Sequence, residues 1–143
     1  MAQNKVQFQK GLSLPDFLNL YGTEDLCFQA LFDWRWPKGF RCSGCGSTKY
    51  CQLSTRKLFQ CGRCHRQESI TSQTIFSSTK LPLTTWFLGL YFITQDKKGV
   101  SALGLKRRLG ISYPAAWRMR QKLMQVMMER EETKVLSGFI EVD

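Results

Sequence analysis

Two pairs of cysteines are the residues of this sequence best suited to chemistry. Cys42 and Cys45 are separated by two residues, and after fifteen further residues Cys61 and Cys64 repeat that spacing. Each Cys-x2-Cys turn can direct two thiolates at one tetrahedral ion, with every sulfur about 2.3 Å from the zinc. Four sulfur ligands leave no open coordination position. The spacing therefore predicts a structural zinc site rather than a catalytic one.

The segment around these cysteines is too small to fold on its apolar residues alone. A module of under about forty residues buries little surface, and metal binding supplies the missing stability, on the order of 10 kcal/mol in zinc peptides. Tyr50 and Leu58-Phe59 are placed for a hairpin that returns the second cysteine pair to the first. We therefore predict a four-cysteine zinc ribbon over residues 38–78.

Two further cysteines and the single histidine lie outside this set. Cys27 and Cys51 are expected to be small, buried apolar side chains. His65 directly follows Cys64 and could replace a ligand, but a surface position is the expectation. The same paired spacing also occurs in rubredoxin-type iron carriers, so an electron-transfer protein stays open as an alternative that visible absorption would reveal.

Positive charge is concentrated in two windows of the chain. The 143 residues include 21 Lys and Arg against 11 Asp and Glu, a net charge of +10. Residues 35–66 and 97–122 each hold eight basic residues and no acid, together 16 of the 21. Such clustering suits a phosphate backbone and favours nucleic-acid binding over a merely solvated basic surface.

Helices are expected on both sides of the ribbon. Within residues 1–37, Ser13 and Thr23 are candidate N-caps of two short helices that Gly22 separates. Residues 80–132 predict three more helices, the first of them apolar on nearly every side. A turn at Gly110 joins the second to the third, as in a helix-turn-helix domain.

The third of these helices carries side chains able to read DNA. On a helical wheel four polar residues share one face: Arg118, Gln121, Lys122 and Gln125. Arg and Gln make bidentate contacts with guanine and adenine edges in the major groove. Three basic residues at the end of the preceding helix lie alongside: Lys106, Arg107 and Arg108. They favour a DNA-reading helix over an amphipathic helix with a solvated polar face.

Apolar residues of the same helix are expected to pack inward. Ala116, Leu123 and Met127 lie on the face opposite the polar one, and Met124 and Met128 are also expected to be packing residues.

No segment of the sequence is expected to cross a membrane. The N-terminal residues lack the apolar core of a secretory signal. The apolar run 81–93 has thirteen residues, fewer than the ~20 that a bilayer requires. The sequence thus predicts a cytoplasmic protein with no membrane partner, in which cysteines are metal ligands rather than disulfides.

The order of these features resembles bacterial insertion-sequence transposases that carry an N-terminal zinc ribbon and a ribonuclease-H-like (DDE-type) catalytic domain. The matching stretches, in order, are RWPKGFRCSGC, FQCGRCHRQESITSQTIF, LPLTTWFLGLYFI, LGISYPAAWRMRQKL and GFIEVD. The resemblance implies that Asp143 is the first of three acidic residues that bind two divalent ions, Mg²⁺ or Mn²⁺. Its two acidic partners have no counterpart in this sequence. The chain is therefore expected to be truncated, and to bind DNA without cleaving it.

These inferences combine into one expectation of a small α+β fold. It consists of a helical N-terminus (1–37), a four-cysteine zinc ribbon (38–78), a three-helix helix-turn-helix domain (80–132) and an orphan C-terminal strand (133–143). The predicted function is that of the N-terminal DNA-binding part of an insertion-sequence transposase, with structural Zn²⁺. Its predicted partners are double-stranded DNA of transposon terminal repeats and transposase copies, in a homo-oligomer or a mixed oligomer with the full-length protein. The alternative is a transcriptional regulator built from a zinc ribbon and a helix-turn-helix.

Overall fold

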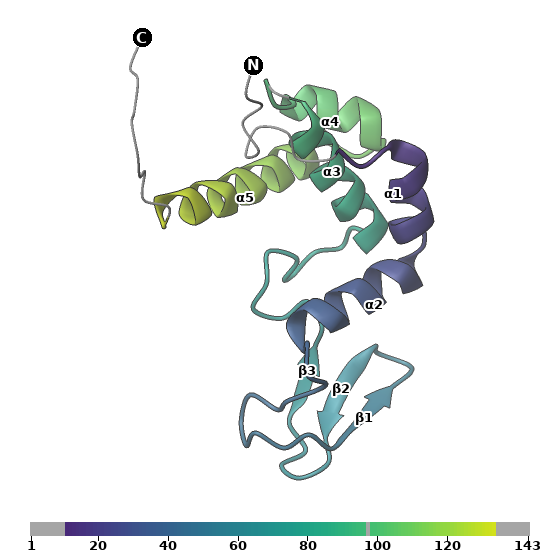
Figure 1. Cartoon of the computed structure of the whole chain (residues 1–143), viewed down its shortest axis with the longest axis vertical. Coiled ribbons are helices and arrows are strands. Elements are labelled where there is room, and N and C mark those ends of the chain that lie inside the picture. The colour runs from purple at the N-terminus through teal and green to yellow at the C-terminus, as the bar shows by residue number, and fades with distance from the viewer. Residues whose placement is uncertain (1–10, 97, 134–143) are drawn as a thin grey trace, which may run out of the picture. The chain divides into compact units, whose positions relative to one another are not determined.

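The computed structural model describes residues 11–96 and 98–133, which form the predicted small α+β fold (Figure 1). These residues contain five helices and one three-stranded antiparallel sheet. The chain divides into two compact units that meet between Tyr91 and Phe92, inside helix α3 (Leu83–Gln95). The predicted strand before Asp143 lies outside the described residues.

Two short helices open the described part of the chain. Helix α1 (Leu14–Tyr21) begins after Ser13, and helix α2 (Glu24–Arg35) begins after Thr23. Each of these hydroxyls accepts a hydrogen bond from the backbone N–H three residues later, at 3.3 Å in both cases. Both predicted N-caps are confirmed, because each cap satisfies an N–H that has no partner within its helix.

The sheet of the ribbon has the order β1-β2-β3. Strands β1 (Tyr50–Leu53) and β2 (Leu58–Cys61) form the predicted hairpin, in which Tyr50 is paired with Cys61. Strand β3 (Gln67–Ser69), which was not predicted, pairs antiparallel with β2. Because β2 carries two of its four residues buried and lies in the middle, it links the metal-binding turns to the core of this unit.

An aromatic cluster around Phe59 forms the core between the sheet and α2. Phe59 is only 1% exposed. Its ring centroid lies 5.3 Å from that of Trp36, 5.4 Å from that of Phe32 and 5.8 Å from that of Phe28. These three rings belong to α2 and the residue after it, so α2 supplies the apolar surface that so small a sheet lacks.

Helix α3 begins against a side chain of α2. The backbone N–H and the hydroxyl of Thr84 both donate to Oε1 of Glu24, at 2.8 and 2.9 Å. Trp86 and Phe87 are buried, and the indole N–H of Trp86 donates to the hydroxyl of Thr79. No helix among the described residues combines the length and apolarity needed to span a membrane.

The second unit contains the predicted pair of helices joined by a tight turn. Helix α4 (Ala102–Leu109) begins after Ser101, and helix α5 (Tyr113–Glu132) begins after Ser112. Between them Gly110 has a φ of +66°, a left-handed conformation that glycine adopts without strain. Four side chains form the core between these helices: Leu105, Ala116, Met119 and Leu123.

The methionines in the last turns of α5 are more exposed than predicted. Met127 is 40% exposed rather than packed inward, and Met124 and Met128 are 42% and 57% exposed. The reason is length. Helix α4 has eight residues and α5 has twenty, so the last turns of α5 extend past the partner helix.

Candidate metal centre and nucleic-acid interface

The four predicted zinc ligands converge on one point. The Sγ atoms of Cys42, Cys45, Cys61 and Cys64 all lie within 4.8 Å of one another. The closest pairs, Cys42 with Cys64 and Cys45 with Cys61, are 3.5 Å apart. Zinc bonds of about 2.3 Å in a tetrahedron separate neighbouring sulfurs by about 3.8 Å. The observed set therefore fits a structural zinc ion, and no other such group occurs in the described part of the chain.

The two cysteine turns have the same backbone geometry. The residue two positions after the first cysteine donates its N–H to that sulfur, at 3.4 Å from both Gly44 and Arg63. The residue four positions after it donates to the carbonyl of the first cysteine, at 3.0 Å from Gly46 and 3.1 Å from His65. Gly46 and His65 both have a left-handed backbone conformation, with φ of +70° and +57°. The shared hydrogen bonds aim two sulfurs from each turn at the same ion.

The charges of the sulfurs favour a cation between them. The N–H groups of Cys64 and Arg63 lower the pKa of Cys61 to about 6, so this thiol ionises below neutral pH. At Cys64 the N–H of Arg66 lowers the pKa, but the neighbouring Cys42 thiol and burial outweigh it and raise the pKa to about 12. Cys61 thus ionises readily, whereas Cys64 holds its proton more tightly than an ordinary thiol. A Zn²⁺ ion supplies the charge that allows all four thiols to ionise.

A buried carboxylate ties the two turns to α2. Glu68 in β3 is 7% exposed, and its Oε1 accepts hydrogen bonds from the N–H of Ser43, at 3.2 Å, and from the Ser43 hydroxyl. The guanidinium of Arg35 lies 3.8 Å from Oε2, and that of Arg66 lies 3.6 Å from Oε1. Glu68 therefore holds residues next to both ligand pairs, as outer-shell groups of metal sites commonly do.

Glu68 was not predicted from the sequence, although a signal was present. Glu68 is the one acidic residue between Asp33 and Asp96 in the sequence. A lone carboxylate inside a long basic stretch is well placed to pair with those charges, and its burial here depends on two arginines.

The remaining cysteines and the histidine lie outside the metal centre. Cys27 is fully buried and its thiol donates to the carbonyl of Tyr21 at 3.2 Å, which confirms the predicted packing role. Burial, aided by the charge of Glu24, raises the pKa of Cys27 to about 11. Cys51 is exposed, so the prediction that it is buried was wrong, because β1 is an edge strand with three exposed residues. The His65 side chain is exposed, as expected.

The predicted DNA-reading residues lie on exposed parts of the second unit. Four of them are exposed side chains along α5, opposite buried Ala116 and Leu123: Arg118, Gln121, Lys122 and Gln125. Gln125 donates to Glu129 at 2.9 Å, one turn along the helix. Tyr113 and Trp117, which were not predicted, are each 49% exposed on this helix.

The basic residues at the end of α4 differ in their contacts. Lys106, Arg107 and Arg108 are all exposed. Arg108 donates to Asp96 at 3.1 Å and its guanidinium lies 5.1 Å from the Phe92 ring centroid. Arg120, for which the sequence offered no role, donates to the carbonyl of Val100 at 2.9 Å. Arg108 and Arg120 therefore stabilise the unit, whereas Lys106 and Arg107 form no ion pair within the described residues.

A three-stranded sheet with two Cys-x2-Cys turns around one centre defines a zinc-ribbon protein. Residues 22–67 match the transposase zinc-ribbon domain of the IS1595 type. An uncharacterized protein in transposable element ISH50 of Halobacterium salinarum is 25% identical over 112 residues, which cover 76% of this chain and 37% of that protein. This chain thus spans little more than a third of that relative's length, and no solved structure matches it.

These findings identify a transposase zinc-ribbon domain in this chain. They support the resemblance to the N-terminal portion of an insertion-sequence transposase and a transposase-related role. The match begins at residue 22, just before α2, in agreement with the packing of α2 on the sheet through Phe59.

Proposed function

We propose that this chain is the DNA-binding part of an insertion-sequence transposase and that it recognises the terminal repeats of its element. The observation that carries this proposal is the match of residues 22–67 to a transposase zinc ribbon. The relative in a transposable element supports the same role. Association with further transposase copies at paired ends is part of the proposal.

Sequence reading is proposed for the exposed face of α5. Arg118 and Gln121 carry the donor and acceptor groups that suit guanine and adenine edges in the major groove. Trp117 lies one turn before Gln121 and offers apolar surface to thymine methyl groups. The left-handed turn at Gly110 and the short α4 support the proposal of a helix-turn-helix, a motif whose second helix enters the major groove.

Contacts that do not depend on sequence are proposed for the ribbon. Its basic side chains are exposed and, apart from Arg66 beside Glu68, none forms an ion pair within the described residues: Lys38, Arg41, Lys49, Arg56, Lys57, Arg63 and Arg66. Such groups release counterions from the phosphate backbone, so their contribution falls steeply with salt.

A titration of DNA by the zinc-loaded chain tests this function. Labelled duplexes of the element's terminal repeats, of promoter DNA and of scrambled repeats are compared by fluorescence anisotropy at several salt concentrations. Terminal repeats should bind at least 10³-fold more tightly than scrambled DNA, as specific sites typically do. Preference for promoter DNA would instead favour the transcriptional regulator, and equal binding of all three would contradict end recognition.

A further inference from the structure

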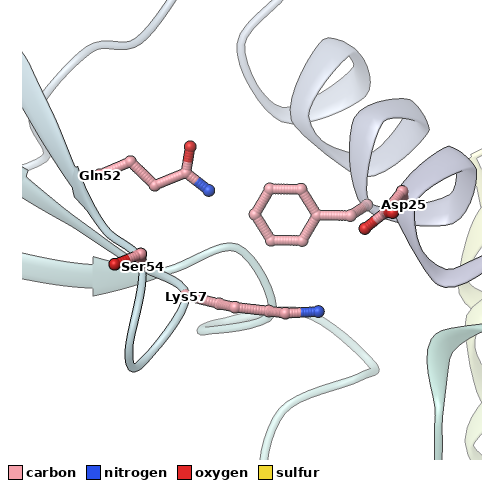
Figure 2. Close-up of a pocket in the computed structure, with 5 residues that line it drawn as sticks. Asp25, Gln52, Ser54 and Lys57 are labelled. Carbon is pink, nitrogen blue, oxygen red and sulfur yellow. The ribbon is translucent and has the colours of Figure 1, made fainter.

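A hollow of about 320 Å³ lies in the first unit between α2 and the β1–β2 hairpin (Figure 2). None of the four clustered cysteines lines it. Its walls come from α2, from β1 and from the turn after β1: Asp25, Phe28, Gln52, Ser54 and Lys57. The hollow is at the small end of the range for ligand sites, where a single planar group fits better than an extended molecule.

The hollow combines one aromatic ring with four polar side chains of different chemistry. Phe28 is half-buried and stacks on Phe59, with centroids 5.8 Å apart and planes at 18°, so its ring is fixed. Figure 2 shows the side chains of Gln52 and Lys57 extending from the hairpin toward α2, where Asp25 lies. An amide, a hydroxyl, an ammonium and a carboxylate therefore surround one fixed aromatic ring.

The polar side chains of the hollow are exposed and therefore accessible to a ligand. Within the part of the chain that the structure describes, the side chains of Asp25, Gln52 and Ser54 form no hydrogen bond. Lys57 acts on Glu24 only through its charge. It also has a φ of +48°, a left-handed conformation that is strained for a side chain of this kind.

We propose that this hollow binds one unpaired nucleobase of a DNA strand. The base stacks on the exposed surface of Phe28, and Gln52 and Ser54 hydrogen-bond to its edge. Lys57 contacts the adjoining phosphate. Stacking on an aromatic ring together with cationic contacts is the general means of holding unpaired bases. The inference rests on the proposed function, because it assumes that the surrounding basic ribbon lies on DNA.

The carboxylate of Asp25 adds a preference among the bases. A carboxylate repels phosphate, so it suits the base edge rather than the backbone. Guanine presents two adjacent N–H donors on its pairing edge, which the two oxygens of Asp25 can accept. The hollow should therefore prefer guanine over adenine.

The test compares two duplexes of the same sequence, one fully paired and one with a single bulged dG. The zinc-loaded full chain should bind the bulged duplex about tenfold more tightly, the size of effect that stacking of one base gives. Gln52→Ala and Lys57→Gly should abolish this preference. Lys57→Gly also relieves the left-handed strain, so its melting temperature should not fall and unfolding cannot explain the loss.

Two further variants make the comparison specific. Arg56→Ala removes an exposed positive charge from the same turn but does not line the hollow, so it should keep the preference for the bulge. Asp25→Asn should reduce the preference for a bulged dG over a bulged dA.

Equal binding of the bulged and paired duplexes by the wild-type chain would overturn the base site and leave the proposed function intact. Persistence of the preference in Gln52→Ala and Lys57→Gly would also overturn it. Tighter binding of the matching bulged RNA would reject DNA as the occupant. Failure to bind any duplex would overturn both proposals.

Discussion

His65 occupies in the second cysteine turn the position that Gly46 occupies in the first, with φ of +57° against +70°. A left-handed conformation costs a non-glycine residue about 1 kcal/mol or more. Because the imidazole is exposed, no side-chain contact of His65 in the described structure offsets this cost. We expect His65→Gly to raise the free energy of unfolding of the zinc-loaded protein by about 1 kcal/mol, measured by denaturant titration. The reverse change, Gly46→Ala, should destabilise it. A loss of zinc from His65→Gly would show that the imidazole contributes to the metal site.

Arg118 and Gln121 are the residues on which sequence reading should depend most. Arg118→Ala and Gln121→Ala should each cost about 1–3 kcal/mol on the preferred DNA and little on scrambled DNA, since they remove base contacts. Lys106→Ala and Arg107→Ala serve as matched controls. They should weaken both DNAs equally and reduce the salt slope, as phosphate contacts do. A parallel loss on both DNAs in the α5 variants would contradict their role in reading bases.

Among whole elements, the start of α3 depends on the charge of Glu24. Burial raises the pKa of Glu24, but the N–H and hydroxyl of Thr84 outweigh it, so the pKa lies below its usual 4.5. The ionised carboxylate therefore stabilises the fold above about pH 4.5, and this contribution is lost as the pH falls through the lowered pKa. Glu24→Gln should melt below the wild type at pH 7, and the difference should shrink as the pH falls below 4.5. Thermal melts across this range, followed by circular dichroism, check it. A difference that does not depend on pH would mean that the hydrogen bonds matter and the charge does not.

Helix α4 is attached to the end of α3 through Arg108. Its ion pair with Asp96 is partly exposed and its contact with Phe92 is a cation–π pair, interactions that together contribute about 1 kcal/mol. Arg108→Ala should therefore lower the melting temperature by several degrees, and Arg107→Ala, one residue earlier and exposed, should not. Equal melting temperatures in a thermal scan would show that the Asp96 and Phe92 contacts do not stabilise the unit.

Across the whole molecule, local signals predicted the elements and the metal ligands well. Ser13 and Thr23 cap their helices as predicted, because a cap is decided by residues within one turn, and Ser101 and Ser112 cap α4 and α5 in the same way. The cysteine spacing predicted the centre for the same reason. Features decided by distant packing were missed. Strand β3 exists because it pairs with β2, and no periodic pattern can appear in three residues.

Exposure was the least predictable property, because it depends on where the neighbours end. Cys and Met are common in protein cores, but Cys51 lies on an edge strand and Met127 lies beyond the end of α4. The hollow beside Phe28 could not be predicted from the sequence for a similar reason. It is lined by residues of α2 and of the hairpin, which no local sequence pattern connects.

The division into two units predicts how the molecule responds to loss of zinc. Cys61 is a ligand candidate, and it lies in β2 two residues after Phe59, whose ring packs against α2. Cys61→Ser should therefore release the metal and disorder both the ribbon and α2. Helices α4 and α5 have their own core around Leu105 and Met119, and they supply 28 of the 61 helical residues in the described structure. Loss of α2 removes 12 of those 61 residues, so about four-fifths of the helical circular dichroism signal should then remain.

Lowering the pH should have the same effect as the substitution, because protons compete with zinc for the thiolates. Zinc released between pH 7 and pH 4 is measured with a chromogenic chelator, and protected amides are mapped by hydrogen exchange. Cys51→Ser is the control, since this exposed cysteine lies outside the cluster and its loss should leave one zinc per chain. If α4 and α5 lost protection together with the ribbon, the two units would fold as one. If Cys51→Ser lost its zinc, the four-cysteine assignment would be wrong.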